Sequence, residues 1–232
     1  MQNIKYKNKQ LKISCDGGAA TGKSTGARMI SNIYKLKFLS SGLLYRYASY
    51  LILKFKPKNE ISFIRKRFRS FNLKVLNKNN LHTPDISEHS SRIAKNKSLR
   101  EILKKIQISF AKKNVRCCIE GRDISTKIIP NSDLKFFFKC SLNIAANRRY
   151  KELKNKNCKI KLKDVKKALR LRNYSDTKRK HSPLLRHRNS IVIDTGKLNK
   201  PSMLRKMSSH VDRFFEKKYG RKTRAKISKL KS

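Results

Sequence analysis

Acidic residues are scarce in this chain. Only 14 Asp and Glu stand against 61 Lys and Arg in 232 residues, which gives a formal net charge of +47. Such an excess attracts polyanions: nucleic acid, anionic membrane surfaces or phosphorylated small molecules. The charge can mark a nucleic-acid-binding protein, or it can reflect an AT-rich genome, which the eighteen Asn also suggest. We favour the second interpretation, because no aromatic-interleaved basic motif and no zinc-ligand spacing accompany the charge.

Paired cysteines and long apolar runs are also missing. None of the five cysteines forms a C-x-x-C pair, and four of them lie in apolar stretches typical of buried strands: Cys15, Cys117, Cys118 and Cys140. Free thiols in a reducing compartment are therefore expected. No stretch approaches the roughly 20 apolar residues that cross a bilayer, and residues 1–10 do not resemble a signal peptide. We expect a cytoplasmic monomer without membrane contact.

Apolar strand patterns alternate with helical patterns along most of the chain. Strands are predicted at residues 11–15, 38–41, 115–119, 134–140 and 191–193. Helices are predicted at residues 22–36, 43–54, 86–111, 142–153, 162–171 and 200–215. This alternation predicts an α/β fold of three layers, in which a parallel sheet carries helices on both faces.

Two segments depart from this alternation. Residues 71–76 alternate apolar and polar side chains, and Asn-Lys-Asn-Asn follows at 77–80, which predicts a small antiparallel β insertion. Residues 220–232 are basic and contain no acid, which predicts a disordered tail.

The clearest motif of the chain is G-G-A-A-T-G-K-S-T at residues 17–25, between a predicted strand and a predicted helix. It contains the phosphate-binding pattern G-x-x-x-x-G-K-S, whose backbone N–H groups and helix N-terminus bind phosphate oxygens. Lys23 is expected to reach the β- and γ-phosphates, and the Ser24 hydroxyl to bind Mg²⁺. The motif predicts an ATP site formed by Gly17, Gly18, Ala19, Ala20, Thr21, Gly22, Lys23, Ser24 and Thr25.

Two arginines follow other predicted strands. Arg46 ends S-G-L-L-Y-R, in which Ser41 is placed to cap the next helix, and Arg122 lies in E-G-R-D after the third strand. Open α/β sheets bind ligands at the carboxyl ends of their strands. Fixed guanidinium groups at that edge suit a second phosphate opposite the first. The arrangement favours a kinase over the GTPase or nucleic-acid ATPase that a phosphate loop alone allows.

Six motifs follow one another along the chain: G-G-A-A-T-G-K-S-T, S-G-L-L-Y-R, L-R-E-I-L-K-K-I-Q, E-G-R-D-I-S-T, N-R-R-Y-K-E-L and D-T-K-R-K-H-S-P-L. In this order, over about residues 11–215, they resemble the bacterial cytidylate kinases. The resemblance implies ATP- and Mg²⁺-dependent phosphorylation of CMP and dCMP. It also implies a kinase domain over residues 1–219, with a β-containing monophosphate-binding insertion at about 55–86 and a mobile lid at about 171–184.

The resemblance also implies roles for individual residues. Ser41, Arg46 and Arg122 match residues that hold the CMP phosphate. Residues around the cytosine are matched by Ser91, Arg100 and Asp123. In the lid, Arg172 and Arg179 match two arginines of the family, and Asp176 matches an aspartate that contacts the ribose. Arg148 matches a basic residue near the ATP phosphates, and Lys23 with the two lid arginines would be catalytic.

Several positions depart from the family pattern. Gly18 replaces the usual Pro, and Ser125 the usual Gly. In the lid, Glu, Asp and Arg are replaced in turn by Leu171, Asn173 and Ser175. One lid arginine is therefore missing, although nearby charge is available from Arg170, Lys178 and Lys180.

Two other functions remain open from the sequence. The first is a basic phosphate-loop ATPase that binds nucleic acid, which the charge favours but which does not require Arg46 and Arg122. The second is another small-molecule kinase of the same fold, acting on UMP, AMP or shikimate.

Overall fold

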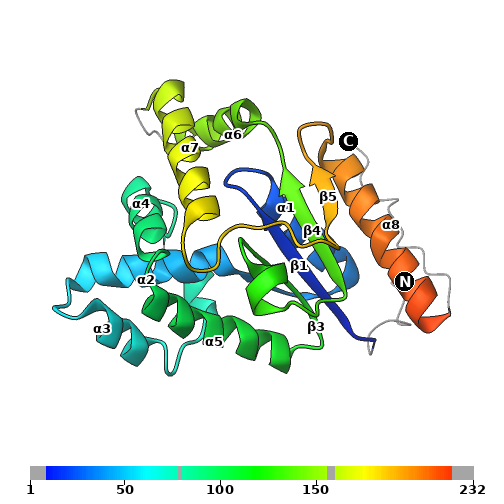
Figure 1. The fold of residues 1–232 in the computed structure, drawn as a ribbon, viewed down its shortest axis with the longest axis horizontal. Coiled ribbons are helices and arrows are strands. Elements are labelled where there is room, and N and C mark those ends of the chain that lie inside the picture. Colours follow the sequence, from blue (N-terminus) through cyan, green and yellow to red (C-terminus); the bar gives the residue numbers. More distant parts are fainter. Residues whose placement is uncertain (1–8, 78–79, 156–159, 221–232) are drawn as a thin grey trace.

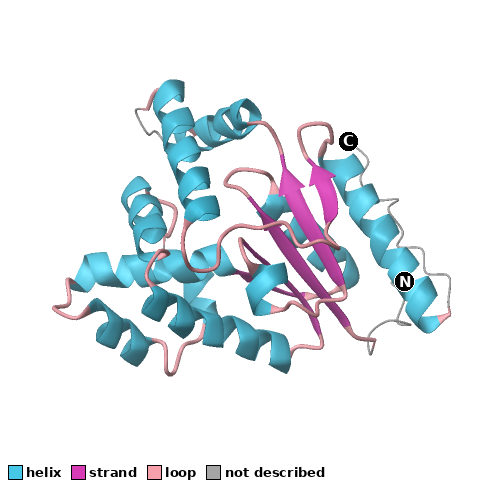
Figure 2. Cartoon of the chain, in the orientation of Figure 1, coloured by secondary structure: helices cyan, strands magenta, loops and turns pink. Residues whose placement is uncertain are grey.

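Five parallel strands form the centre of the protein, in the order β2-β3-β1-β4-β5. A computed structural model describes residues 9–77, 80–155 and 160–220. The strands are β1 (Leu11–Gly17), β2 (Lys37–Ser40), β3 (Arg116–Gly121), β4 (Leu134–Lys139) and β5 (Ile191–Asp194). Parallel neighbours need crossover connections, so helices separate the strands along the chain. Figures 1 and 2 show the resulting wound sheet and confirm the predicted α/β fold.

Helices cover both faces of the sheet. One face carries α1 (Lys23–Tyr34) and α8 (Lys200–Tyr219), whereas α2 (Ser41–Phe55) and α5 (Lys97–Lys113) pack on the other. The helices α6 (Leu142–Lys154) and α7 (Leu162–Lys178) lie past the arrowhead of β4 in Figure 1. Among the described helices, none is both long and apolar enough to span a membrane.

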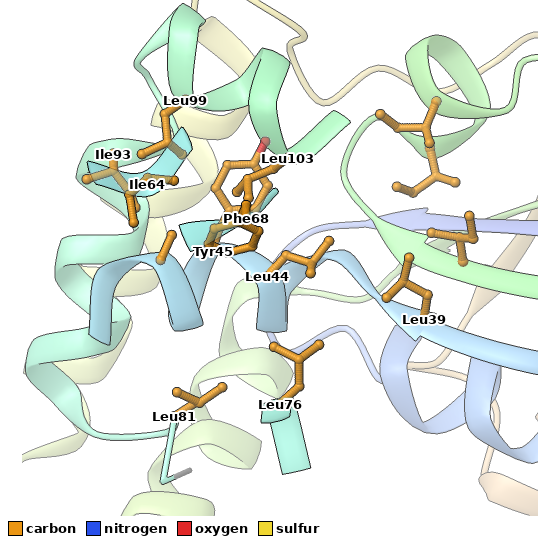
Figure 3. Packing of buried hydrophobic residues seen from close by; sticks show 14 of the residues in the cluster. Leu39, Leu44, Tyr45, Ile64, Phe68, Leu76, Leu81, Ile93, Leu99 and Leu103 are labelled. Atoms are coloured by element: carbon orange, nitrogen blue, oxygen red, sulfur yellow. The ribbon is translucent and has the colours of Figure 1, made fainter. Parts of the chain in front are cut away.

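Each face of the sheet has its own core. Phe136 and Phe138 of β4 are fully buried under α1 and α8. Gly26 of α1 allows this close approach, since a Cβ atom there would lie 2.7 Å from the Phe138 ring. Figure 3 shows the second core, in which Leu44 of α2 and Leu103 of α5 are fully buried. The two cores hold the carboxyl ends of β1 and β3 in place from both sides.

The region predicted as a β insertion is helical instead. After α3 (Glu60–Arg67) the chain forms a short 3-10 helix, η2 (Leu73–Asn77), and no strand lies between residues 55 and 86 where they are described. Apolar and polar side chains do alternate at residues 71–76, but the antiparallel strands predicted from this alternation are wrong. Phe71, Leu73 and Val75 are partly buried while Asn72 and Lys74 are exposed, as in a strand, but no strand in the described part of the chain pairs with them.

Two helices also differ from their predicted lengths. Residues 86–111 form two helices, α4 (Pro84–Ile93) and α5, because the Asn96 side chain accepts a hydrogen bond from the Leu99 N–H and starts a new helix. Helix α7 continues beyond residue 171 to Lys178, so much of the predicted lid lies on one helix. Residues 221–232 of the predicted tail and Cys158 lie outside the described residues.

The second core predicts a stability experiment. Leu103→Ala should lower the free energy of unfolding by about 2–5 kcal/mol, because the side chain is fully buried and a cavity would remain. Leu53→Ala, in which the original side chain is 38% exposed, is the matched control and should change it by less than about 1 kcal/mol. Equal losses in chemical denaturation would contradict this account of the core.

Candidate active site

The phosphate loop joins β1 to α1 at the carboxyl edge of the sheet. Gly17 has φ +153°, and a Cβ atom on it would lie 2.4 Å from the Phe138 carbonyl oxygen, so only glycine fits there. Gly22 has φ +78° and precedes the first helical residue, Lys23. Both glycines let the backbone turn sharply into the helix, whose N-terminus then faces the space beyond the sheet.

A cavity of about 840 Å³ opens at this edge. Its walls include residues 19–25 of the phosphate loop together with Arg46 from α2 and Arg122 after β3. Arg148 and Arg149 of α6 and Arg172 of α7 also line it. The structure thus brings four of the arginines predicted from separate motifs (46, 122, 148 and 172) to one cavity with the phosphate loop.

Lys23 pairs with Glu120 at the end of β3. Its Nζ lies 3.1 Å from Glu120 Oε2, and both side chains are buried. The Ser40 hydroxyl donates to the same carboxylate. Burial opposes ionisation of Glu120, but Lys23, Ser40 and Arg122 outweigh it and lower the pKa of its carboxyl. Burial lowers the pKa of the Lys23 ammonium, and the charge of Glu120 opposes this shift.

Ser40, not Ser41, occupies the N-cap position of α2. Ser41 is the first helical residue, one place later than predicted, and it is buried. The Ser40 hydroxyl makes no capping bond because it is directed at Glu120.

The arginines of the cavity crowd one another. Burial, and then repulsion by Arg149 and Arg122, lowers the pKa of Arg46 to about 10. Burial and Arg122 lower the pKa of Arg172 to about 9, and its Nε is buried without a hydrogen-bond partner. Both remain protonated at neutral pH. A cluster of half-buried like charges favours a multiply charged anion, which would relieve the repulsion.

Asp176 of α7 links the cavity to the rest of the predicted acceptor site. Its carboxylate accepts from Arg122 Nε at 2.7 Å and lies 3.3 Å from Arg179 Nη1. Burial opposes ionisation of Asp176, but Arg122 and Arg172 outweigh it and lower its pKa. Arg172 and Asp176 are four residues apart and so face the same way.

Arg100 and Asp123 form a second buried pair. Arg100 Nη2 lies 2.5 Å from Asp123 Oδ2, and the guanidinium stands 5.5 Å from the Tyr45 ring centroid. Arg179 lies close enough to both that their charges shift its pKa in opposite directions, although burial, which lowers it, is the main cause. Ser91 lies in α4, where its hydroxyl donates to the Ser87 carbonyl, and its placement near a base stays a prediction.

Helix α7 bonds the phosphate loop directly, and α6 bonds it through Thr195. Arg148 donates to the Thr195 hydroxyl at 2.9 Å and to its carbonyl at 2.7 Å, and the Thr195 hydroxyl donates to the Thr21 carbonyl. From α7, the Asn173 amide oxygen accepts from the Ala19 N–H at 3.1 Å. Asn173, one of the lid departures, therefore joins the predicted lid to the loop. A Cβ atom on Gly18 would lie 3.2 Å from the same oxygen.

Sequence reasoning missed several residues that shape this site. Glu120 stood in a quoted motif but received no role. His82 lines the cavity, and its Nδ1 lies 3.2 Å from Arg46 Nη1. Arg46 Nη1 also donates to the Leu81 carbonyl. No motif marks His82 or Thr195, because their contacts join segments far apart in sequence. Glu120 could have been found as the one carboxylate directly before G-R-D at a strand end.

Comparisons with known proteins identify the family of this chain. The sequence model of the cytidylate kinase family matches residues 13–213. The chain belongs to the cytidylate kinase family. The cytidylate kinase of Bartonella tribocorum is 34% identical over 197 residues, which cover 82% of this chain and 89% of that protein. The cytidylate kinase of Rickettsia conorii is 32% identical over 200 residues, covering 86% and 90%.

The fold of this family member also matches solved structures. A crystal structure of an uncharacterized protein from Eubacterium ventriosum has a TM-score of 0.52 and covers 88% of this chain and 99% of that chain. Its sequence identity is 14%, so it shows a shared fold alone.

The Lys23–Glu120 pair generates the next prediction. Lys23→Met should lower kcat for ATP-dependent phosphoryl transfer by about 100-fold or more, since a buried charge facing the phosphates is lost. It should also lower the melting temperature, because Glu120 keeps a buried charge without its lysine. Adding Glu120→Gln removes that charge and should restore stability without restoring activity. Exposed Lys112→Met is the control. Normal turnover of folded Lys23→Met protein would contradict the site.

Proposed function

We propose that this protein transfers the γ-phosphoryl group of ATP to CMP and dCMP. One observation carries the proposal. The phosphate loop lines a single cavity together with Arg46, in the helix after β2, and Arg122, directly after β3. A site that only hydrolyses ATP needs the phosphate loop alone. Arg46 and Arg122 suit an acceptor phosphate that faces the donor.

The reaction needs no covalent intermediate on the protein. An oxygen of the acceptor phosphate attacks the γ-phosphorus, a new P–O bond forms, and the bond to the β-phosphate oxygen breaks to release ADP. The transition state is loose and highly charged, so catalysis consists of alignment and charge stabilisation. Lys23 would hold the β- and γ-phosphates. Arg172 lies in α7 and Arg179 directly after it, and both would stabilise the negative charge on the transferred group. Ser41 would join Arg46 and Arg122 on the acceptor phosphate, and Arg148 would contact the donor.

A magnesium ion fits this site. The Ser24 side chain is exposed at the cavity wall, and Glu120 lies at its floor. Mg²⁺ is usually held by few protein groups with phosphate oxygens and water, so the small donor set is suitable. Among the described residues, no group of three or more His, Cys, Asp or Glu competes as a metal site. When bound, the ion would neutralise phosphate charge; Ser24 would hold it.

The buried Arg100–Asp123 pair supports cytosine as the base. Cytosine presents an amino donor at N4 beside acceptors at N3 and O2. An ionised Asp123 accepts hydrogen bonds, whereas Arg100 and Arg179 donate them, and Ser91 does either. Asp176 would contact the ribose. Uracil places O4 against the carboxylate and N3–H against a guanidinium, which leaves buried polar groups unpaired at about 1–3 kcal/mol each.

Asp123→Ala tests this assignment of the base. The variant should lower kcat/KM for CMP by about tenfold or more and change the value for UMP far less, so that the two substrates converge. Asp164→Ala removes an exposed acid of α7 and is the matched control. Equal losses for CMP and UMP would contradict the base assignment, while the kinase reaction itself would stand.

The positive charge predicts a separate, non-specific interaction. Any binding of RNA or DNA should be independent of sequence and weaken steeply between 50 and 200 mM salt, since counterion release drives it. A protein ending at Gly220 should keep its kinase activity, because α8 ends at Tyr219 and every residue assigned to the site lies before it. Salt-resistant binding of one nucleic-acid sequence would favour the nucleic-acid ATPase. Loss of kinase activity on truncation would contradict the prediction that the segment after Gly220 is dispensable.

A further inference from the structure

Asp16 is a buried carboxylate outside the residues assigned to catalysis and binding. It is the last residue before Gly17 of the phosphate loop and is 0% exposed. Its oxygens accept from the Ile124 N–H at 2.8 Å, the Ser125 N–H at 2.8 Å and the Ser125 hydroxyl at 2.5 Å. All these donors belong to the start of η3 (Ile124–Ile128), the single helical turn that follows Arg122 and Asp123.

The first N–H groups of a helical turn have no partner within the helix, and the residue just before it usually caps them with its side chain. That residue is Asp123 here, an amino acid well suited to capping. Its side chain makes no capping bond. The Asp123 carboxylate is directed instead at Arg100 Nη2, and Arg100 Nη1 is fixed by the Ala94 carbonyl at 3.1 Å. Asp16 therefore caps the turn in place of Asp123.

We propose that Asp16 is a positioning residue for acceptor selectivity: by capping η3, it leaves the Asp123 carboxylate available to the base. The inference rests on the proposed function of Asp123. Without Asp16, two buried N–H groups would lack an acceptor, and the adjacent Asp123 side chain is the carboxylate best placed to turn toward them. An unpaired buried group shifts such an equilibrium by roughly 5- to 150-fold.

Two further observations support the division of roles between these carboxylates. Burial raises the pKa of Asp16, the hydrogen bonds from Ser125 and Ile124 oppose that shift, and the charge of Asp123 adds to it. Asp16 and Gly121 are register partners in β1 and β3, so the same side chain ties the start of the phosphate loop to the segment carrying Arg122 and Asp123. Ser125, where the family usually has Gly, adds the hydroxyl bond.

Asp16→Asn tests the inference, with kcat and KM measured for CMP, UMP and ATP. The amide keeps one acceptor oxygen but places a donor against the second N–H group. The CMP-to-UMP ratio of kcat/KM should fall at least about fivefold through a higher KM for CMP, while the KM for ATP stays within about twofold. Ser125→Ala is the matched control: it removes one hydrogen bond to Asp16 but frees no N–H, and should keep the ratio within about twofold.

The outcomes separate this inference from the proposed function. A fall in kcat that is equal for CMP and UMP, with unchanged KM values, would show a purely structural role for Asp16 and overturn the inference. A wild-type protein that does not prefer CMP to UMP would instead overturn the base assignment of Asp123. If Asp16→Asn is not recovered folded, Asp16→Ser, whose hydroxyl accepts one N–H bond, is read by the same ratio.

Discussion

Repulsion among buried and half-buried cations is the constraint on which the site depends. Lys23, Arg46, Arg122 and Arg172 share one cavity, and burial with mutual repulsion lowers the pKa of Arg46 to about 10 and of Arg172 to about 9. In this acid-poor chain the buried carboxylates of the described residues are placed at the site: Asp16, Glu120, Asp123 and Asp176. Three of them pair with cations, and together they hold the cluster in a geometry that phosphates can complete.

Local motifs were predictable because each encodes its own geometry. The phosphate loop needs glycine at 17 and 22 for backbone reasons, and residues at strand ends must meet at one edge of a parallel sheet. The pairs that join these motifs were not predictable. Lys23–Glu120 and Arg122–Asp176 span 97 and 54 positions, and no spacing rule connects them. The fold brings them together through packing of both cores.

The insertion shows where pattern reasoning failed. Alternation at residues 71–76 identified the side chains that face the protein but not the backbone that carries them. A strand needs a partner for its backbone hydrogen bonds, whereas a 3-10 turn can present the same side chains without one. Phe68 and Phe71 stack with ring centroids 4.5 Å apart and pack the segment against the core around α2. Helix α7 also extends past its predicted end at residue 171 to Lys178, so Asn173 reaches the phosphate loop from a helix.

Phosphorus-31 NMR of the purified protein with ATP, Mg²⁺ and CMP tests the central claim most directly, because it identifies every phosphorus-containing product. The account predicts that ADP and CDP appear in equal amounts with little inorganic phosphate, and that replacing CMP by UMP or AMP slows the reaction strongly. Release of inorganic phosphate without CDP, accelerated by added nucleic acid, would contradict it.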